Sequence, residues 1–300
     1  PKVVQSATIM HKINKRGLMS AKQSAKQTTS SSAPVYNSNP FTLAFDALGR
    51  FFNTNAGWAI AVIIIGFLSF MGQFTSNILQ SNQRRPDLSY STPSPISHPS
   101  TDATTIIAIG VVVFVVLVVF LSLAITISTF IQSMFIHVAL ESEKGNSVTF
   151  SEAFQAVSKR FWRILGATFL AAFKIMGWFL LLIVPGVIAV YRYALLGYVI
   201  MDESEENKSV KASHDRVKAL TKDRLFEVFG VSTVAGIIPF VGSLLGLSGK
   251  AALYRQLQVY HDKKLEKPTI HWLNYIGILL FVVIILLILA FGALVALSSK

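Results

Sequence analysis

Several residue types are scarce in this 300-residue chain, and each scarcity excludes a class of function. The sequence contains no cysteine, which excludes disulfide frameworks, thiolate metal sites and cysteine nucleophiles. Charged residues make up only 14% of the chain, and 15 of them are acidic against 27 basic. These charges are bunched between long uncharged runs, whereas a soluble domain spreads about 25% charged residues over its surface. The chain is therefore expected to lie in an apolar environment such as a lipid bilayer.

Signatures of catalysis are also missing. No Walker glycine loop, G-x-S-x-G elbow or His-Glu-x-x-His helix occurs, and these motifs mark ATPases, common serine hydrolases and zinc proteases. The six histidines fall in different loops or spans, and the pair His137 and Glu141 is more typical of a solvated contact than of an acid–base couple. The acidic run after Met201 can attract a divalent cation, although a solvated loop is the favoured interpretation. We expect no enzyme activity, cofactor, metal site or nucleic-acid partner.

Hydrophobic residues, by contrast, make up 52% of the chain and are concentrated in membrane-length blocks. These blocks cover residues 57–79, 104–140, 164–201, 225–249 and 272–297. Pro185-Gly186 interrupts the third block and Pro239 the fourth, so each is predicted to be a helical hairpin with its turn there. Gly242 and Gly246 form a G-x-x-x-G step that favours close helix packing. The pattern predicts an all-α, multi-pass transmembrane helical bundle.

An internal repeat precedes the predicted hairpins. The segments FTLAFDALGRFF from Phe41 and FSEAFQAVSKRFW from Phe150 have the same apolar spacing, and SVKASHDRVKALTKDRLF from Ser209 is a fainter third copy. Each is predicted to be an interfacial amphipathic helix, and Thr149 with Glu152 predicts a capping box. The apolar faces of these helices can lie in the headgroup layer or pack on the bundle. The bundle is thus predicted to contain about three units of interfacial helix plus hairpin, with one extra C-terminal span.

The distribution of basic residues predicts the topology. If blocks three and four are hairpins, 22 of the 27 lysines and arginines share one side, which the positive-inside rule assigns to the cytoplasm. The N-terminus is then cytoplasmic and the C-terminus outside a cell membrane crossed by seven segments. Residues 225–249 are short for two spans and can be a full hairpin or a re-entrant one; a single span contradicts the charge bias. Residues 1–38 are predicted to be a disordered basic cytoplasmic tail, and residues 39–300 the helical membrane domain.

Two cations within the third block are the leading candidates for a functional site. Lys174 and Arg192 lie in apolar sequence, where a charge is costly and usually has a partner or a function. One hypothesis is that both receive an anionic group such as a lipid phosphate, with Arg160 and Arg163 as further anion-binding residues. The alternative, which we favour slightly, is that Arg192 binds backbone carbonyls and Lys174 extends along an amphipathic groove.

Part of the sequence resembles a known family. The stretch IVPGVIAVYRYALLGYVIMDES, followed by a charged helix, a hydrophobic hairpin and KAALYRQL, is similar to bacterial and archaeal six-helix membrane proteins related to the membrane domain of glycerophosphoryl diester phosphodiesterases. The resemblance covers roughly residues 40–260 and is most specific at Pro185-Gly186 and Tyr191-Arg192-Tyr193. The chain departs from the family at Val217 and Asp223, where a small polar residue and a glycine are expected.

The resemblance implies a fold and a topology and no activity. A phosphodiesterase of that class needs a soluble barrel of about 250 residues, and no soluble segment here exceeds about 40 residues. Two functions stay open. We expect a non-catalytic membrane protein that binds anionic lipid or a cytoplasmic protein through its basic inner face, with homo-oligomerisation also possible. The alternative is a small transporter or permease-like protein for an anionic or lipidic solute, since broken helices are common in transporters.

Overall fold

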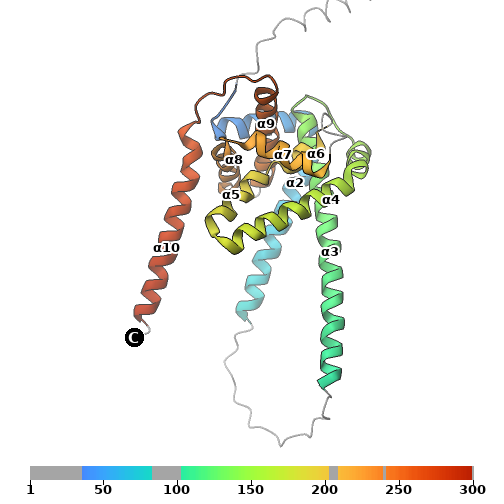
Figure 1. Ribbon diagram of the computed structural model, residues 1–300, viewed down its shortest axis with the longest axis vertical. Coiled ribbons are helices and arrows are strands. Elements are labelled where there is room, and N and C mark those ends of the chain that lie inside the picture. The colour runs from blue at the N-terminus through green and yellow to red at the C-terminus, as the bar shows by residue number, and fades with distance from the viewer. Residues whose placement is uncertain (1–35, 83–102, 203–208, 239–240, 299–300) are drawn as a thin grey trace, which may run out of the picture. The chain divides into compact units, whose positions relative to one another are not determined.

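The computed structural model describes residues 36–82, 103–202, 209–238 and 241–298 (Figure 1). Within these ranges every regular element is a helix, which confirms the predicted all-α class. The elements are α2 (Pro40–Asn82), α3 (Ala103–Ser142), α4 (Phe150–Leu181), α5 (Ile183–Tyr193), α6 (Leu196–Met201), α7 (Val210–Thr221), α8 (Leu225–Ile237), α9 (Gly242–Asp262), the short 3₁₀ helix η2 (Trp272–Tyr275) and α10 (Ile276–Ser298). Most of the predicted 1–38 tail and the predicted turn residue Pro239 lie outside the described residues.

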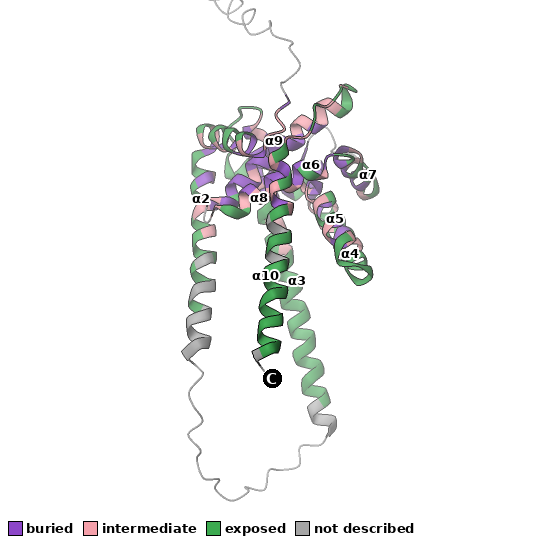
Figure 2. Cartoon of the chain, turned by 90° about the vertical axis from the view of Figure 1, so that its left-hand side faces the viewer, coloured by how far each residue is buried: buried purple, intermediate pink, exposed green. Residues whose placement is uncertain are grey.

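Four helical stretches have the length and hydropathy of a membrane span. They are Pro40–Ser69, Ile107–Ser142, Phe150–Leu181 and Ile183–Met201. α10 adds 23 residues without a charge, about 35 Å of helix, against a hydrocarbon core of about 30 Å. Apolar side chains along the first half of α3 and along α10 are exposed on all sides (Figure 2), which is typical of helices in contact with lipid. The chain is an integral membrane protein.

Buried residues are concentrated in one cluster of helices (Figure 2). The cluster contains the first part of α2 together with α6, α8 and α9, and α2 packs extensively on α9. The second part of α2, the first part of α3 and the whole of α10 extend from this cluster in the same direction (Figure 1). The ends of α2 and α10 and the start of α3 are therefore at the opposite end from the cluster.

A kink divides α2 into the predicted interfacial helix and the first span. Asn55 has non-helical angles (φ −136°, ψ 48°) and is 5% exposed. Its side chain donates to Ser142 Oγ (2.8 Å) and the Asn146 carbonyl (3.0 Å), and accepts from the Val148 N–H (2.8 Å). The end of α3 and the loop after it thus supply hydrogen-bond partners to the buried Asn55 side chain at the kink, as buried polar groups require.

The amphipathic segments use two neighbouring faces. In α2 the small residues Ala44 and Ala47 are fully buried, whereas Phe45 is 46% exposed. In α4 Ala153 is likewise buried, and Phe154 is 47% exposed. One face of each helix therefore packs on the bundle, while Phe45 and Phe154 are left exposed; a position of the exposed face in the headgroup layer stays a prediction. The Thr149–Glu152 capping box at the start of α4 is confirmed.

The third block forms the predicted hairpin, but its turn is not at Pro185-Gly186. α4 and α5 pack together and are separated by Leu182, which is extended (φ −157°, ψ 142°). Pro185 and Gly186 instead lie in the first turn of α5, where a missing N–H costs no helical hydrogen bond. Gly186 packs on Phe179, whose ring would lie 2.6 Å from a Cβ at that position. The predicted turn position is thus corrected by three residues.

The fourth block is a short pair of helices and not a single span. The chain leaves the helix between Ile237 and Gly242, and α8 and α9 pack side by side. α8 has 13 residues, about 20 Å, which is too short for a core of about 30 Å. The length of α8 favours the re-entrant alternative for residues 225–249 over two full spans. Gly242 and Gly246 both face Ala235 of α8.

Candidate functional site

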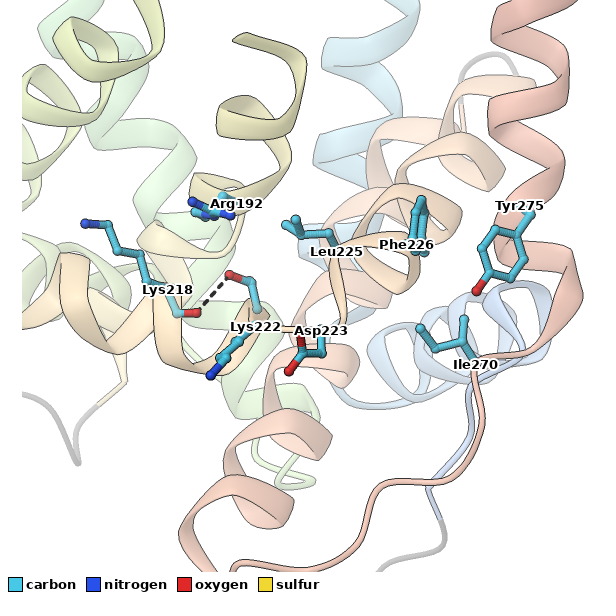
Figure 3. A pocket seen from close by; sticks show the side chains of 9 residues that line it. Arg192, Lys218, Lys222, Asp223, Leu225, Phe226, Ile270 and Tyr275 are labelled. Atoms are coloured by element: carbon cyan, nitrogen blue, oxygen red, sulfur yellow. Dashed lines mark hydrogen bonds between the residues drawn. The ribbon is translucent and has the colours of Figure 1, made fainter. Parts of the chain in front are cut away.

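A pocket of about 600 Å³ lies between the end of α5, the end of α7 with the α7–α8 turn, and η2 with the residues before it (Figure 3). Its lining residues are Arg192, Lys218, Thr221, Lys222, Asp223, Leu225, Phe226, Ile270 and Tyr275. One of these, Arg192, is a residue that the sequence singled out. The others come from the third amphipathic repeat and from the segment that leads into α10.

Local structure explains how the pocket residues are placed. Ser209 caps α7 by accepting from the Ala212 N–H, and α7 ends at Thr221. Asp223 then takes a left-handed conformation (φ 63°), which aspartate tolerates better than most residues. Glycine would adopt this conformation without a Cβ penalty. The turn sends the chain directly into α8.

A buried ion pair fixes the base of this turn. Arg224 Nη1 lies 3.0 Å from Glu227 Oε1 and donates to the Pro268 carbonyl at 2.7 Å. The two side chains are buried, and a buried pair with further hydrogen bonds is costly to break from one side. Arg224 thereby joins the α7–α8 turn to the strand-like segment before η2.

Positive charge dominates the polar part of the pocket. Arg192, Lys218 and Lys222 are exposed cations, and Asp223 is the acidic residue of the lining. Within the described part of the chain, the Arg192 guanidinium has no hydrogen bond or ion pair. Guanidinium presents five N–H donors in a planar fork that matches phosphate or carboxylate oxygens. The pocket is therefore suited to an anion.

The remaining wall of the pocket is apolar. The rings of Phe226 and Tyr275 pack at a centroid distance of 4.9 Å with their planes tilted by 46°, and the two residues are 41% and 43% exposed. Leu225 and Ile270 complete this side. Aromatic rings next to cations are typical of the membrane–water interface. A molecule that fits both walls carries an anionic group and an apolar part.

Lys174 does not share the pocket with Arg192. Its Nζ lies 3.5 Å from His214 Nδ1 and 5.8 Å from the centre of the Tyr193 ring. His214 Nε2 is 3.1 Å from the Ala167 carbonyl. If Nε2 donates to that carbonyl, Nδ1 is left to accept from Lys174. Lys174 therefore contacts α7 and does not line the Arg192 pocket, and anion binding by Lys174 itself stays a prediction.

The environment of His214 favours its neutral form. The side chain is 1% exposed, and burial together with the positive charge of Lys174 lowers the pKa of His214. The ring also meets Tyr193 edge-on at 5.1 Å. α4, α5 and α7 are thus locked together at one neutral imidazole.

Arg160 and Arg163 hold helices together. Arg160 is 7% exposed and donates to the Met201 carbonyl at the end of α6 (3.2 Å), where helix carbonyls carry partial negative charge. Arg163 donates to Ser213 Oγ of α7 (3.2 Å). These contacts give both arginines a structural role, and anion binding by them stays a prediction.

A second polar network joins Asp202, at the end of α6, to α9. Asp202, 3% exposed, accepts from the Tyr254 hydroxyl (2.8 Å) and from Gln258 Nε2 (2.7 Å). Arg255 Nη1 lies 3.1 Å from the other carboxylate oxygen. The end of α6 and the middle of α9 therefore meet at one buried carboxylate.

Comparisons with protein-family models, curated proteins and solved structures give no match to this chain. Among the described residues, no three His, Asp or Glu side chains are grouped so that they could hold a metal ion. Inferences about the site therefore rest on its geometry. Sequence reasoning missed Lys218, Lys222 and Phe226, although a signal was present. The run KALTKDRLF alternates cations and apolar residues at the junction of a charged helix and an apolar one.

Proposed function

We propose that this membrane protein binds anionic lipid headgroups, without catalysing a reaction, in the pocket around Arg192. The observation that carries the proposal is the meeting of three exposed cations with an aromatic wall. Arg192 offers a planar fork to a phosphate, and Lys218 and Lys222 add point charges. Phe226 and Tyr275 provide an apolar surface for the lipid beyond its headgroup.

The charge distribution supports the cytoplasmic leaflet as the source of the lipid. Of the 27 lysines and arginines, 22 fall in residues 1–56, 138–163, 202–226 and 247–271, and such a bias toward one set of segments is typical of the cytoplasmic side. Anionic lipids are enriched in that leaflet, and each nearby cation contributes about 1 kcal/mol to attraction. We propose a cytoplasmic N-terminus and an external C-terminus in the cell membrane.

Membership of the family related to the phosphodiesterase membrane domain is also a proposal. It is supported by the contacts of Asp202 with Tyr254 and Arg255. These residues come from the two sequence stretches on which the resemblance rests, so one buried contact explains why both stretches would be needed. The left-handed Asp223 at an expected glycine supports the same register.

Lipid binding can be tested by native mass spectrometry of the full chain with phosphatidylglycerol and phosphatidylcholine. We expect Arg192→Lys to weaken retention of phosphatidylglycerol roughly tenfold, because a charge-assisted hydrogen bond contributes about 1.5–3 kcal/mol. The double variant Lys218→Gln/Lys222→Gln should weaken it further. Lys211→Gln is the matched control, since this exposed lysine of α7 does not line the pocket. Equal loss in the control and in Arg192→Lys would contradict a specific site.

The same samples address the remaining alternatives. Flux of a phosphate-bearing solute into liposomes that contain the protein would favour a transporter. The native mass itself would reveal a homo-oligomer. Retention of phosphatidylglycerol and phosphatidylcholine to the same degree would overturn the proposal that the pocket selects anionic lipid.

A further inference from the structure

The α4–α5 hairpin presents an apolar tip whose depth in the membrane can be bounded from its polar contacts. Residues 180–184 around the turn are between 66% and 82% exposed. Length and composition qualify Phe150–Leu181 and Ile183–Met201 as candidate spans. Contacts on both legs, however, place polar groups much closer to the tip than a full crossing allows.

On the descending leg, α7 accompanies α4 as far as Lys174. Arg163 contacts Ser213, the Ala167 carbonyl is bound by His214, and Lys174 lies beside the same imidazole. α7 also carries Lys211, Asp215 and Lys218, all exposed. Such a helix cannot lie in hydrocarbon, where each charged side chain costs at least about 2.5 kcal/mol. The portion of α4 up to Lys174 is therefore at the level of the headgroups.

From Lys174 to the turn at Leu182 is a short distance. Eight residues of helix span about 12 Å, and one leaflet contributes about 15 Å of hydrocarbon. Within this portion Met176 is 53% and Trp178 49% exposed. The leg is long enough to reach the middle of the bilayer and too short to reach the opposite headgroups.

The returning leg gives the same depth independently. α5 has 11 residues, about 16 Å, and Arg192 near its end joins the basic pocket with Lys218 and Lys222. After a turn at Ala194 the chain enters α6, whose Val199 and Ile200 are buried at 0% and 1% exposure. α6 packs on α3, α4, α7 and α9. The second half of the Ile183–Met201 stretch therefore faces protein and cannot extend the leg across the membrane.

We infer that the α4–α5 hairpin is a re-entrant wedge. Residues 175–191 occupy the hydrocarbon of the single leaflet on the α7 side, and the turn at Leu182 ends near the bilayer midplane. The lipid acyl chains of that leaflet cover this apolar surface. The membrane is then crossed by α2, α3 and α10, an odd number that puts the two ends of the helical domain on opposite sides. The inference does not depend on which lipid the Arg192 pocket binds.

A cysteine-labelling experiment on the full chain tests the wedge, because the native sequence has no cysteine. Leu182→Cys is compared with Ser94→Cys, between α2 and α3, and with Lys211→Cys on α7. A membrane-impermeant maleimide should label the Ser94 variant from one side and the Lys211 variant from the other. Leu182→Cys should be labelled from neither side and react after detergent is added. Labelling from the Ser94 side would show a full crossing, and labelling from the Lys211 side would show that the tip is in water; either result overturns the inference.

A depth measurement guards against a cysteine that is unreactive for another reason. Leu182→Cys is coupled to a bimane fluorophore in detergent and reconstituted with lipids brominated at different chain positions. Quenching should be strongest with bromines near the middle of the bilayer. Strongest quenching by bromines near the headgroups would overturn the wedge, and Lys211→Cys carrying the same fluorophore is the control for the shallow position.

Discussion

The α4–α5 and α8–α9 hairpins have similar sequences and opposite surroundings. Each follows an amphipathic segment, and each contains an apolar block with a proline near the middle of that block. The tip of α4–α5 is exposed, whereas Val228, Val231 and Val234 of α8 are 0–2% exposed. Hydropathy therefore identifies both as membrane-like and does not distinguish a lipid-facing hairpin from a protein-facing one.

Side-chain size and nearby polar groups account for the difference. Gly242, Gly246 and Gly249 line the face of α9 that meets α8, and glycine allows two helix backbones to approach closely. The legs of α4–α5 carry leucine, tryptophan and phenylalanine at the tip. A buried carboxylate, Asp202, also binds α9, and no such contact holds the described residues of the α4–α5 tip.

The largest expected effect comes from removing the carboxylate that anchors α9. Asp202→Ala leaves Arg255 and Tyr254 without their acceptor in a buried site, and we expect a loss of about 3–5 kcal/mol in unfolding free energy. Thermal unfolding in detergent measures this loss. Asp46→Ala is the control, because this aspartate is exposed on α2 and should change stability by less than about 0.5 kcal/mol. Equal melting temperatures for the two variants would contradict the anchoring role.

The next largest effect on stability should come from replacing a glycine in each of the two hairpins. A Cβ at Gly242 would lie 2.0 Å from the Ala235 carbonyl oxygen, whereas nothing lies within 4 Å of one at Gly177 in α4. Gly242→Leu should therefore destabilise the protein by about 3 kcal/mol through overpacking. Gly177→Leu should be neutral or slightly stabilising, since leucine favours helix. Similar melting temperatures for both variants would mean that α9 does not pack closely on α8.

Much of this architecture could be predicted from the sequence, and the remainder could not for identifiable reasons. The capping box at Thr149 and the α2 interfacial segment follow from local patterns, as does the α4–α5 hairpin. The turn at Leu182 was misplaced because proline is compatible with a first helical turn as well as with a break. The basic pocket combines Arg192 with residues up to 83 positions away (Tyr275), and local spacing carries no information about such contacts. Lys174 was grouped with Arg192 because the sequence shows that a charge lies in an apolar segment but does not show which residue it contacts.

A smaller effect is expected on the pH dependence of stability, and it should arise at the contact of α7 with the α4–α5 hairpin and not in the α8–α9 pair. The pKa of His214 is lowered in the folded state, so the unfolded chain binds a proton that the folded chain excludes. Stability from this residue is complete above its unfolded pKa of about 6.5 and is lost as pH falls below it. His214→Gln should reduce the slope of melting temperature against pH between pH 7 and 5. An unchanged slope would mean that His214 does not cause the pH dependence of stability.

The smallest expected effects are on stability when glycine is placed in the turn of each hairpin region. The two changes should have opposite signs. Asp223, between α7 and α8, has a positive φ, where glycine is free of the Cβ penalty, so Asp223→Gly should stabilise the protein by about 0.5 kcal/mol. Leu182, between α4 and α5, is extended, where glycine gains nothing and adds entropy to the unfolded chain, so Leu182→Gly should destabilise by a similar amount. Chemical denaturation in detergent can compare the two. A loss of stability in Asp223→Gly would mean that the aspartate side chain, and not the backbone conformation, determines the residue preference at this turn.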